Sequence, residues 1–264
     1  MYLMHFGLKH PVLGKDSAEL YDDGPLSQLR ERFQWLLTSP GIGVLTGESG
    51  VGKTVALRHL THGINPHRYQ VIYLAETDFS RLDIYRSLAI ALGIDPPHRR
   101  APLWREIKAR VLDLADNRHI LPVWVVDESQ NLPNDFFRDF PAFLNFAFDS
   151  RDLLTVWLCG HPCLVQMLQR APYAALASRI QLYLQVRPIC ERERFVPFIH
   201  HAFRVAGAQH TLMSDSGLEL LRQASQGMPR QAGKILHLGL QLAAAKKLNH
   251  LPDEIVQQAI TELR

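Results

Sequence analysis

Short runs of consecutive apolar residues recur between positions 42 and 186, and segments with helical spacing of apolar residues separate them. Five runs have the length of strands: Ile42 to Thr46, Gln70 to Ala75, Pro122 to Val126, Leu153 to Cys159 and Ile180 to Val186. Four of the five lack strict alternation of apolar and polar positions, which is typical of strands buried on both faces of a parallel sheet. Helical spacing is clear at Leu29, Phe33 and Leu37, before the first run. The pattern predicts an α/β fold with a five-stranded parallel sheet.

The character of the chain changes after Pro188, because no strand-like run remains and four helical segments follow. They span Glu191 to Ala206, Asp215 to Ser225, Arg230 to Lys247 and Pro252 to Leu263. Ser216 and Glu219 have the spacing of a capping box in the second of these helices. We therefore expect three parts. Residues 1–40 form an N-terminal segment and a helix that pack on the core, residues 41–188 form the α/β core, and residues 189–264 form a small helical lid.

The composition fits a folded protein of the reducing interior of a cell. Of the 264 residues, 47% are apolar and 21% are charged, which excludes an intrinsically disordered chain. Three cysteines, an odd number, argue against a disulfide framework. The N-terminus lacks the long apolar stretch of a signal peptide, and no run approaches the length that spans a bilayer. We expect a cytoplasmic protein without a membrane partner, and the net charge of +3 permits a polyanionic partner.

The residues after the first predicted strand form a G-x-x-x-x-G-K-T motif. This motif is the phosphate-binding P-loop, in which glycines turn backbone N–H groups toward the phosphates at a helix N-terminus. Lys53 is expected to reach the terminal phosphates, and the Thr54 hydroxyl to bind Mg²⁺. The predicted nucleotide-binding residues are Gly47, Glu48, Ser49, Gly50, Val51, Gly52, Lys53, Thr54 and Val55.

A second motif follows the third predicted strand, which ends in Asp127 and Glu128. This arrangement is a Walker B pattern, although acidic residues after a strand also serve as N-caps of helices. An acid at the end of a strand next to the P-loop can hold Mg²⁺, and an acid beside it can activate water for attack on the γ-phosphate. We assign Asp127 the metal role and Glu128 the catalytic role.

The two motifs, the parallel strands and the C-terminal helices together resemble the AAA+ ATPases. The resemblance implies that ATP and Mg²⁺ are the cofactors and that ATP is hydrolysed. It places His161 as the sensor beside the γ-phosphate, Arg179 as an arginine finger acting on a neighbouring subunit, and Arg230 as the sensor that reaches the phosphates from the lid. The catalytic set is then Glu128, Lys53, Arg179, Arg230 and His161.

Plainer interpretations of these positions stay open. Arg179 could be a surface residue beside a strand, and Arg230 a cation near a helix start. Asn or Thr is more usual than His at the position of His161 in the broader family. Metal ligation by Cys159, His161 and Cys163 is disfavoured, because their spacing is too tight for the usual zinc pairs.

A narrower resemblance rests on residues 5–11, residues 127–132 and Gly160-His161-Pro162. These segments are similar to a group that contains the secretion ATPase ExeA and the IstB-like and phage Mu B-like transposition helpers. Because the chain stops after the lid, without the membrane span of ExeA-type proteins, we expect the transposition branch. That branch implies ATP-dependent binding of duplex DNA without sequence preference, homo-oligomeric rings or filaments, and recruitment of a DDE transposase. The alternatives are an ExeA-like ATPase that acts on protein or secretion assemblies, and a low-turnover nucleotide-operated switch.

Two further segments are candidates for interaction surfaces. In related DNA-handling AAA+ proteins, positive residues between the second and third strands line the ring pore, so we single out Arg99, Arg100, Arg105 and Lys108 as DNA contacts. A solvated turn is the alternative. The six phenylalanines between positions 135 and 150 exceed what one helix contact needs, and either core packing on two sides or a subunit contact would explain them.

Overall fold

The computed structural model describes residues 2–14, 19–22 and 24–263. Two compact units can be separated. The sheet unit consists of Ser27–Gly47 and Ala56–Val186, and the helical unit consists of the described residues of Met1–Leu26, Glu48–Val55 and Arg187–Arg264.

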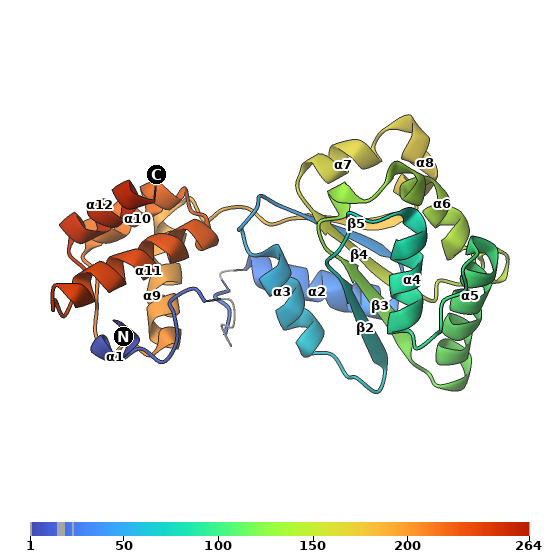
Figure 1. Ribbon diagram of the computed structural model, residues 1–264, viewed down its shortest axis with the longest axis horizontal. Helices are drawn as coiled ribbons and strands as arrows, with labels where there is room; N and C mark the ends of the chain where they lie inside the picture. The colour runs from blue at the N-terminus through green and yellow to red at the C-terminus, as the bar shows by residue number, and fades with distance from the viewer. Residues whose placement is uncertain (1, 15–18, 23, 264) are drawn as a thin grey trace. The chain divides into compact units, whose positions relative to one another are not determined.

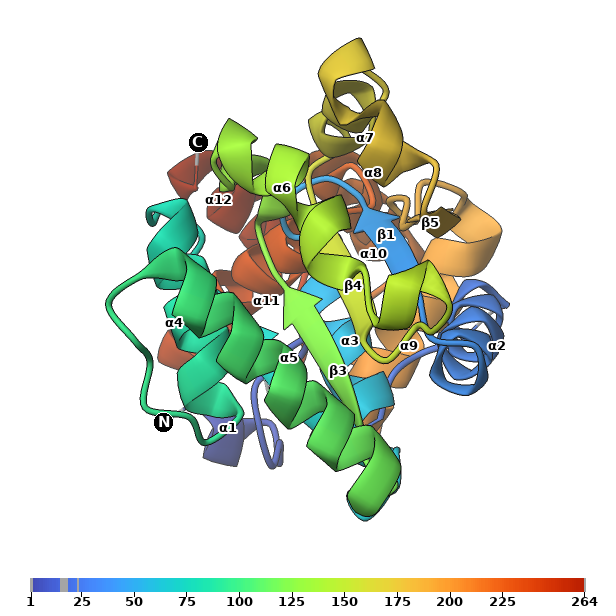
Figure 2. The same cartoon turned by 90° about the vertical axis from the view of Figure 1, so that its right-hand side faces the viewer.

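The sheet unit contains five parallel strands, which confirms the predicted α/β fold. The strands are β1 (Ile42–Thr46), β2 (Tyr69–Leu74), β3 (Leu121–Val126), β4 (Thr155–Gly160) and β5 (Ile180–Gln185), in the order β2-β3-β4-β1-β5. The longer helices are α2 (Pro25–Thr38), α3 (Lys53–His62), α4 (Arg81–Ala91), α5 (Arg100–Asn117) and α6 (Asn134–Leu144). Two short helices, α7 (Cys163–Leu168) and α8 (Ala174–Ala177), precede β5. Helices α2 and α3 cover one face of the sheet, and α4, α5 and α6 lie on the other (Figure 1, Figure 2).

Burial along the strands follows their position in the sheet. The three central strands β1, β3 and β4 are almost entirely buried, which is why their sequences are continuous apolar runs. Trp124 of β3 and Trp157 of β4 are fully buried on opposite faces, where Trp124 packs on α6 and Trp157 stacks on Phe33 of α2. The edge strands β2 and β5 alternate between more and less buried positions, since only one of their faces is fully covered.

The helical unit is a bundle of α9 (Arg192–Ala206), α10 (Asp215–Ser225), α11 (Pro229–Ala245) and α12 (Asp253–Glu262). Its apolar core also takes in the N-terminal residues Phe6, Leu8 and Val12. The short helix α1 (Tyr2–His5) lies against α11, and the Tyr2 hydroxyl bonds to His237 Nδ1 at 3.0 Å. The sequence led us to expect all of residues 1–40 on the core. In the structure the first residues pack in the helical unit, and α2 packs on the sheet.

Helix α10 begins at a different cap from the one that the sequence suggests. The Ser214 hydroxyl accepts a hydrogen bond from the Gly217 N–H at 2.9 Å, so Ser214 is the N-cap, and Ser216 lies inside the first turn. Ser214 also donates to Asp253 at 2.6 Å, which connects α10 to the start of α12. The capping box predicted at Ser216 and Glu219 is therefore wrong.

This cap gives a stability prediction. Ser214→Ala should lower the free energy of unfolding of the helical unit by about 1 kcal/mol, because the Gly217 N–H in the first helical turn loses its acceptor. The matched control is Ser216→Ala, two residues away, which should cost a few tenths of that amount. Urea unfolding followed by circular dichroism measures both variants, and equal losses would contradict the assignment of the cap.

Candidate nucleotide site

The order of the strands brings Gly47, the acidic pair and His161 to the carboxyl ends of three neighbouring strands. Strand β4 lies between β1 and β3, so the residues that follow these strands are neighbours in space. The P-loop starts at Gly47 after β1, the acidic pair follows β3, and His161 follows β4. The Gly47 N–H donates to the Gly160 carbonyl at 3.2 Å, which joins the beginning of the P-loop to the end of β4. This edge is where an open α/β sheet binds its ligand.

The P-loop has the backbone that phosphate binding requires. Gly50 and Gly52 have φ angles of 85° and 107°, which a residue with a side chain rarely adopts. Lys53 is the first residue of α3, its side chain is buried, and its ammonium donates to the Glu48 carbonyl at 3.2 Å. The ammonium thus folds back onto the loop at the N-terminus of α3, where a helix favours negative charge.

Arg230, far away in the sequence, contacts the same loop. Its guanidinium Nη1 donates to the Ser49 hydroxyl at 3.1 Å, and its backbone N–H donates to the Gly50 carbonyl at 3.2 Å. A Cβ atom on Gly50 would come within 2.7 Å of the Arg230 Cβ atom, so the close approach also requires a glycine. The structure thereby brings together the P-loop and the arginine predicted to reach the phosphates.

The acidic pair after β3 is held by its neighbours on the sheet edge. Asp127 is buried, and its Oδ2 atom accepts a hydrogen bond from the Tyr73 hydroxyl of β2 at 2.9 Å. Its other oxygen, Oδ1, accepts from the Glu128 N–H at 3.0 Å. Burial, followed by the negative charge of Asp127, raises the pKa of Tyr73, so the phenol stays protonated and remains a donor to the carboxylate.

Glu128 lies in a turn whose backbone conformation is held by hydrogen bonds. It has left-handed angles, φ 49° and ψ 37°, which a non-glycine residue adopts at some cost in energy. The buried Thr77 hydroxyl donates to the Glu128 carbonyl at 3.1 Å, and the Asn131 N–H donates to it at 2.9 Å. Glu128 is exposed.

The donor set fits Mg²⁺. A carboxylate at Asp127 and a hydroxyl at Thr54 are the hard oxygen ligands that this ion prefers, together with nucleotide phosphates and water. Hydrogen bonds from the Tyr73 hydroxyl to Oδ2 and from the Glu128 N–H to Oδ1 hold the Asp127 carboxylate at the end of β3. The zinc alternative finds no support, because no group of three or more His, Cys, Asp or Glu side chains in the described part of the chain could hold a metal ion.

Arg179 lies at the amino end of β5, opposite the carboxyl ends of the strands where the acidic pair and His161 lie. It precedes β5, so it is separated from the carboxyl ends of the strands by the length of a strand, about 15 to 20 Å. Its guanidinium forms two hydrogen bonds of 2.7 Å to both oxygens of Asp149. This pairing lowers the pKa of Asp149 and raises that of Arg179. A cavity of about 240 Å³ adjoins the pair, with an apolar wall that includes Leu144, Phe146 and Leu154.

Asp149 belongs to a turn of unusual conformation. Ala147, Phe148 and Asp149 are three consecutive residues with φ angles of 47°, 57° and 63°. Left-handed conformations cost L-residues roughly 1 to 2 kcal/mol each. Phe148 at the centre is fully exposed, whereas Phe136, Phe137, Phe140, Phe143 and Phe146 are buried in the core. Core packing therefore explains five of the six phenylalanines, and only Phe148 is available for a subunit contact.

The predicted DNA contacts occupy α5 and the residue before it, and two of the four have partners within the sheet unit. Arg100 donates to Asp139 at 2.5 Å, and its guanidinium lies 5.1 Å above the Trp104 ring. Lys108 donates to the carbonyls of Ala142 and Asn145 at 3.2 and 2.8 Å, at the C-terminal end of α6, and burial lowers the pKa of its ammonium. Arg99 and Arg105 are exposed.

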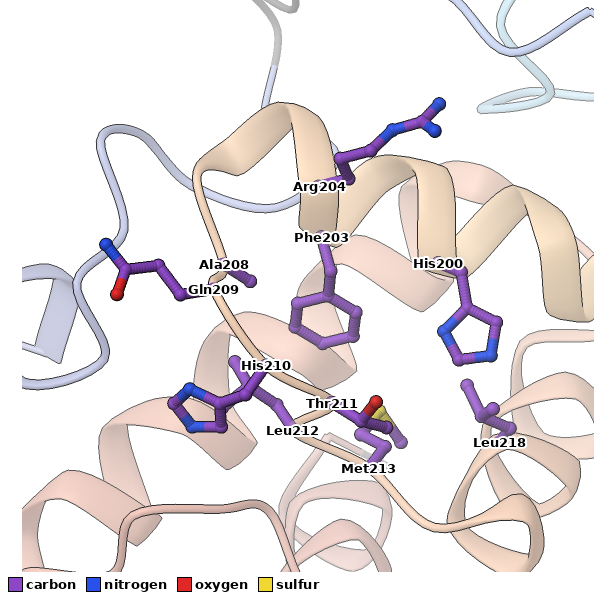
Figure 3. A pocket seen from close by; sticks show the side chains of 10 residues that line it. All are labelled: His200, Phe203, Arg204, Ala208, Gln209, His210, Thr211, Leu212, Met213 and Leu218. Carbon is purple, nitrogen blue, oxygen red and sulfur yellow. The ribbon is translucent and has the colours of Figure 1, made fainter.

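A second hollow, also of about 240 Å³, lies wholly within the helical unit (Figure 3). His200 and Phe203 of α9 and His210 and Thr211 of the following loop line it, and the Arg204 side chain points away from it. It shares no residue with the predicted nucleotide site.

With this geometry in place, comparison with known proteins identifies the family. A family model described as the AAA domain matches residues 36–168, from the end of α2 to the end of α7. The chain belongs to the AAA domain family. The matched region contains the P-loop, the acidic pair and His161, whereas Arg179 and Arg230 lie beyond it.

The chain is also similar to general secretion pathway protein A of Aeromonas hydrophila, with 26% identity over 252 residues. The alignment covers 93% of this chain and 45% of that protein, so the chain spans less than half the length of this relative. The ExeA side of the predicted resemblance is thereby supported, and the IstB-like and Mu B-like side stays a prediction.

Solved structures extend the likeness of fold over nearly the whole chain. Cdc6p from Pyrobaculum aerophilum has a TM-score of 0.72 at 20% identity, covering 95% of this chain and 70% of that one. The Aeropyrum pernix ORC1 protein in complex with DNA has a TM-score of 0.69 at 16% identity, covering 96% and 68%. At these identities the likeness establishes the AAA+ fold, including a helical C-terminal region.

Proposed function

We propose that this AAA domain protein hydrolyses ATP and uses the nucleotide to assemble on duplex DNA. The proposal that the protein binds a nucleotide rests mainly on one observation. Two groups predicted to bind phosphate and separated by about 180 residues meet, since the Arg230 guanidinium bonds to Ser49 of the P-loop at 3.1 Å. A structural role for Arg230 would not require that its partner be the phosphate-binding loop.

Each residue of the site has its own proposed role in hydrolysis. The P-loop N–H groups and Lys53 bind the β- and γ-phosphates, and Arg230 adds a positive charge from α11. Glu128 accepts a proton from the attacking water, and His161 donates a hydrogen bond near the γ-phosphate. Mg²⁺ held by Thr54 and Asp127 would neutralise the charge that builds up between the β- and γ-phosphates.

Arg179 is assigned a role in trans. The proposal is supported by its position before β5, whereas Glu128 follows the carboxyl end of β3, so the length of a strand separates Arg179 from the acidic pair of its own protomer. Such head-to-tail contacts generate rings if they close and filaments if they do not. Asp149 then holds the guanidinium in the isolated protomer, and a neighbouring nucleotide would replace this carboxylate as its partner.

We further propose that the assembled protein binds DNA without sequence preference and recruits or activates a DDE transposase. The support is the resemblance of its motifs to transposition helpers and the likeness of its fold to a protein solved in complex with DNA. An ATPase that acts on protein or secretion assemblies is the second candidate. The general secretion pathway relative favours it. In the described residues no helix combines the length and the apolarity needed to cross a membrane.

Nucleotide-dependent DNA binding separates these candidates. A fluorescent duplex of random sequence is titrated at near-physiological salt with a non-hydrolysable ATP analogue, with ADP, and without nucleotide. We expect tight binding with the ATP analogue only. Absence of binding in all three states would reject the DNA proposal and leave the protein-directed ATPase.

The salt dependence of that binding tests the predicted DNA contacts. Each phosphate contact contributes a slope of about −0.9 to the plot of log affinity against log salt, so Arg99→Ala with Arg100→Ala should flatten the slope by about two. The matched control is Arg118→Ala at the other end of α5, where the guanidinium pairs with Asp113 at 3.2 Å. An unchanged slope in the double variant would remove Arg99 and Arg100 from the DNA interface.

A further inference from the structure

The side chain of Gln130 connects two parts of the candidate site. Its Oε1 atom accepts a hydrogen bond from the His161 backbone N–H at 2.9 Å. Its Nε2 atom donates to Glu128 Oε2 at 2.6 Å. One amide thus bridges the carboxylate that faces solvent after β3 and the first residue after β4.

The chemistry of the partners fixes the orientation of this amide. A backbone N–H can only donate, so the Gln130 oxygen must face His161. The amino group then necessarily faces Glu128, whose ionised carboxylate can only accept. A flipped amide would lose both hydrogen bonds, and the bridge is therefore specific for a side chain that is an acceptor at one end and a donor at the other.

Neighbouring residues restrict the conformations that the Gln130 and Glu128 side chains can adopt. A Cβ atom on Gly160 would lie 2.4 Å from the Gln130 Oε1 atom, so any other residue at position 160 would displace the amide. Ser129, fully buried between the bridged residues, donates from its hydroxyl to the Val126 carbonyl at 2.7 Å and anchors the turn. With the Glu128 carbonyl already bonded twice, the side-chain torsions are the main freedom left to Glu128, and Gln130 restrains them.

We propose that Gln130 is a positioning residue for ATP hydrolysis. It orients the Glu128 carboxylate so that Oε2 is occupied by the amide and Oε1 is presented to the attacking water, and it couples this orientation to the position of His161. The inference rests on the proposed role of Glu128 as the group that activates water, and adds the residue that determines where its carboxylate lies. We expect the restraint to act on the chemical step and not on nucleotide affinity, because the two partners of Gln130, Glu128 and the His161 backbone N–H, lie outside the P-loop.

Two substitutions at position 130 separate positioning from structural support. Gln130→Met has nearly the same shape and removes both hydrogen bonds. Gln130→Glu keeps an acceptor for the His161 N–H but places a carboxylate against Glu128. If Gln130 positions Glu128, both variants should lose about 10- to 100-fold in kcat for ATP, with KM and nucleotide affinity within about twofold of the wild type. If Gln130 only supports the end of β4, Gln130→Glu should keep the wild-type rate.

A combined variant shows whether the effect passes through Glu128. In a Glu128→Gln background, Gln130→Met should change the residual rate by less than about twofold, because two groups that act as one unit are not additive. The melting temperature and the binding of a fluorescent ADP analogue are measured for every variant. If Gln130→Met does not fold, the result for Gln130→Glu alone decides the test. Wild-type kcat in Gln130→Glu, or a full additional loss in the Glu128→Gln background, would overturn the inference while leaving the ATPase intact. Absence of ATP hydrolysis by the wild-type protein, with or without DNA, would instead reject the proposed function and this inference with it.

Discussion

Glu128→Gln should reduce ATP hydrolysis by about 10²- to 10⁴-fold, the usual contribution of a positioned general base. The substitution keeps the size of the side chain and removes the ability to accept a proton from water. Nucleotide affinity should stay within about twofold of the wild type, because the phosphate contacts are proposed for the P-loop, Lys53 and Arg230 and not for Glu128. Steady-state phosphate release measures the rate, and binding of a fluorescent ATP analogue measures affinity.

The matched control for this prediction is Glu106→Gln, because Glu106 of α5 is also exposed. It should hydrolyse ATP at the wild-type rate. If Glu128→Gln retained more than about a tenth of the wild-type rate, another residue would have to activate the water. The Walker B assignment would then be reduced to the metal role of Asp127.

Arg179→Ala should reduce hydrolysis by about 10³-fold or more and leave ATP binding intact, as expected for an arginine supplied to a neighbouring site. Arg151→Ala is the matched control, because Arg151 is also an arginine of the sheet unit that pairs with an aspartate, Asp116, at 2.6 Å. Loss of nucleotide binding in Arg179→Ala would place the guanidinium in the site of its own subunit.

Mixing two inactive variants tests the action in trans directly. In an equimolar mixture of Arg179→Ala and Glu128→Gln protomers, an intact Glu128 meets an intact neighbouring Arg179 at about a quarter of randomly formed interfaces, so about a quarter of the wild-type rate should return. Arginine action within one subunit predicts no recovery. The same mixture with Lys53→Ala in place of Glu128→Gln should recover similarly, because a donor of arginine needs no nucleotide site of its own.

The elements of the fold that could be predicted from the sequence are those governed by local patterns. Strand β1 was predicted with the bounds that the structure gives, because a buried central strand and the glycine-rich loop after it leave a clear signature. Helix α10 was also placed correctly, although its cap was not, since Ser214 and Ser216 are both good capping residues and the choice depends on Asp253, 39 residues away.

The candidate site divides in the same way. Lys53 and Asp127 belong to motifs that a single segment displays, so the sequence could point to them. The partners of the predicted residues could not be predicted, since each is a contact between distant segments. Asp149 for Arg179 and Asp139 for Arg100 are pairs of this kind.

Two further features follow from turns with left-handed residues. Glu128 and the run from Ala147 to Asp149 adopt conformations that the sequence gives no reason to expect, because none of these residues is a glycine. The resulting bridge through Gln130 and the exposure of Phe148 depend on these conformations. Such strained positions are held by tertiary structure, which local propensity does not describe.

The position of β1 in the sheet determines when during synthesis the sheet can fold. Strands β2 and β3 pair with each other, but β1 pairs only with β4 and β5, which are synthesised roughly a hundred residues later. At about 5 to 20 residues per second, the ribosome needs some 5 to 30 seconds to supply these partners. During that interval the apolar strand before the P-loop has no sheet to join, so the nascent chain carries an aggregation-prone segment until Gln185 has emerged. We expect the nucleotide site to be one of the last parts of this protein to form, and chains that end before β4 to depend on chaperones.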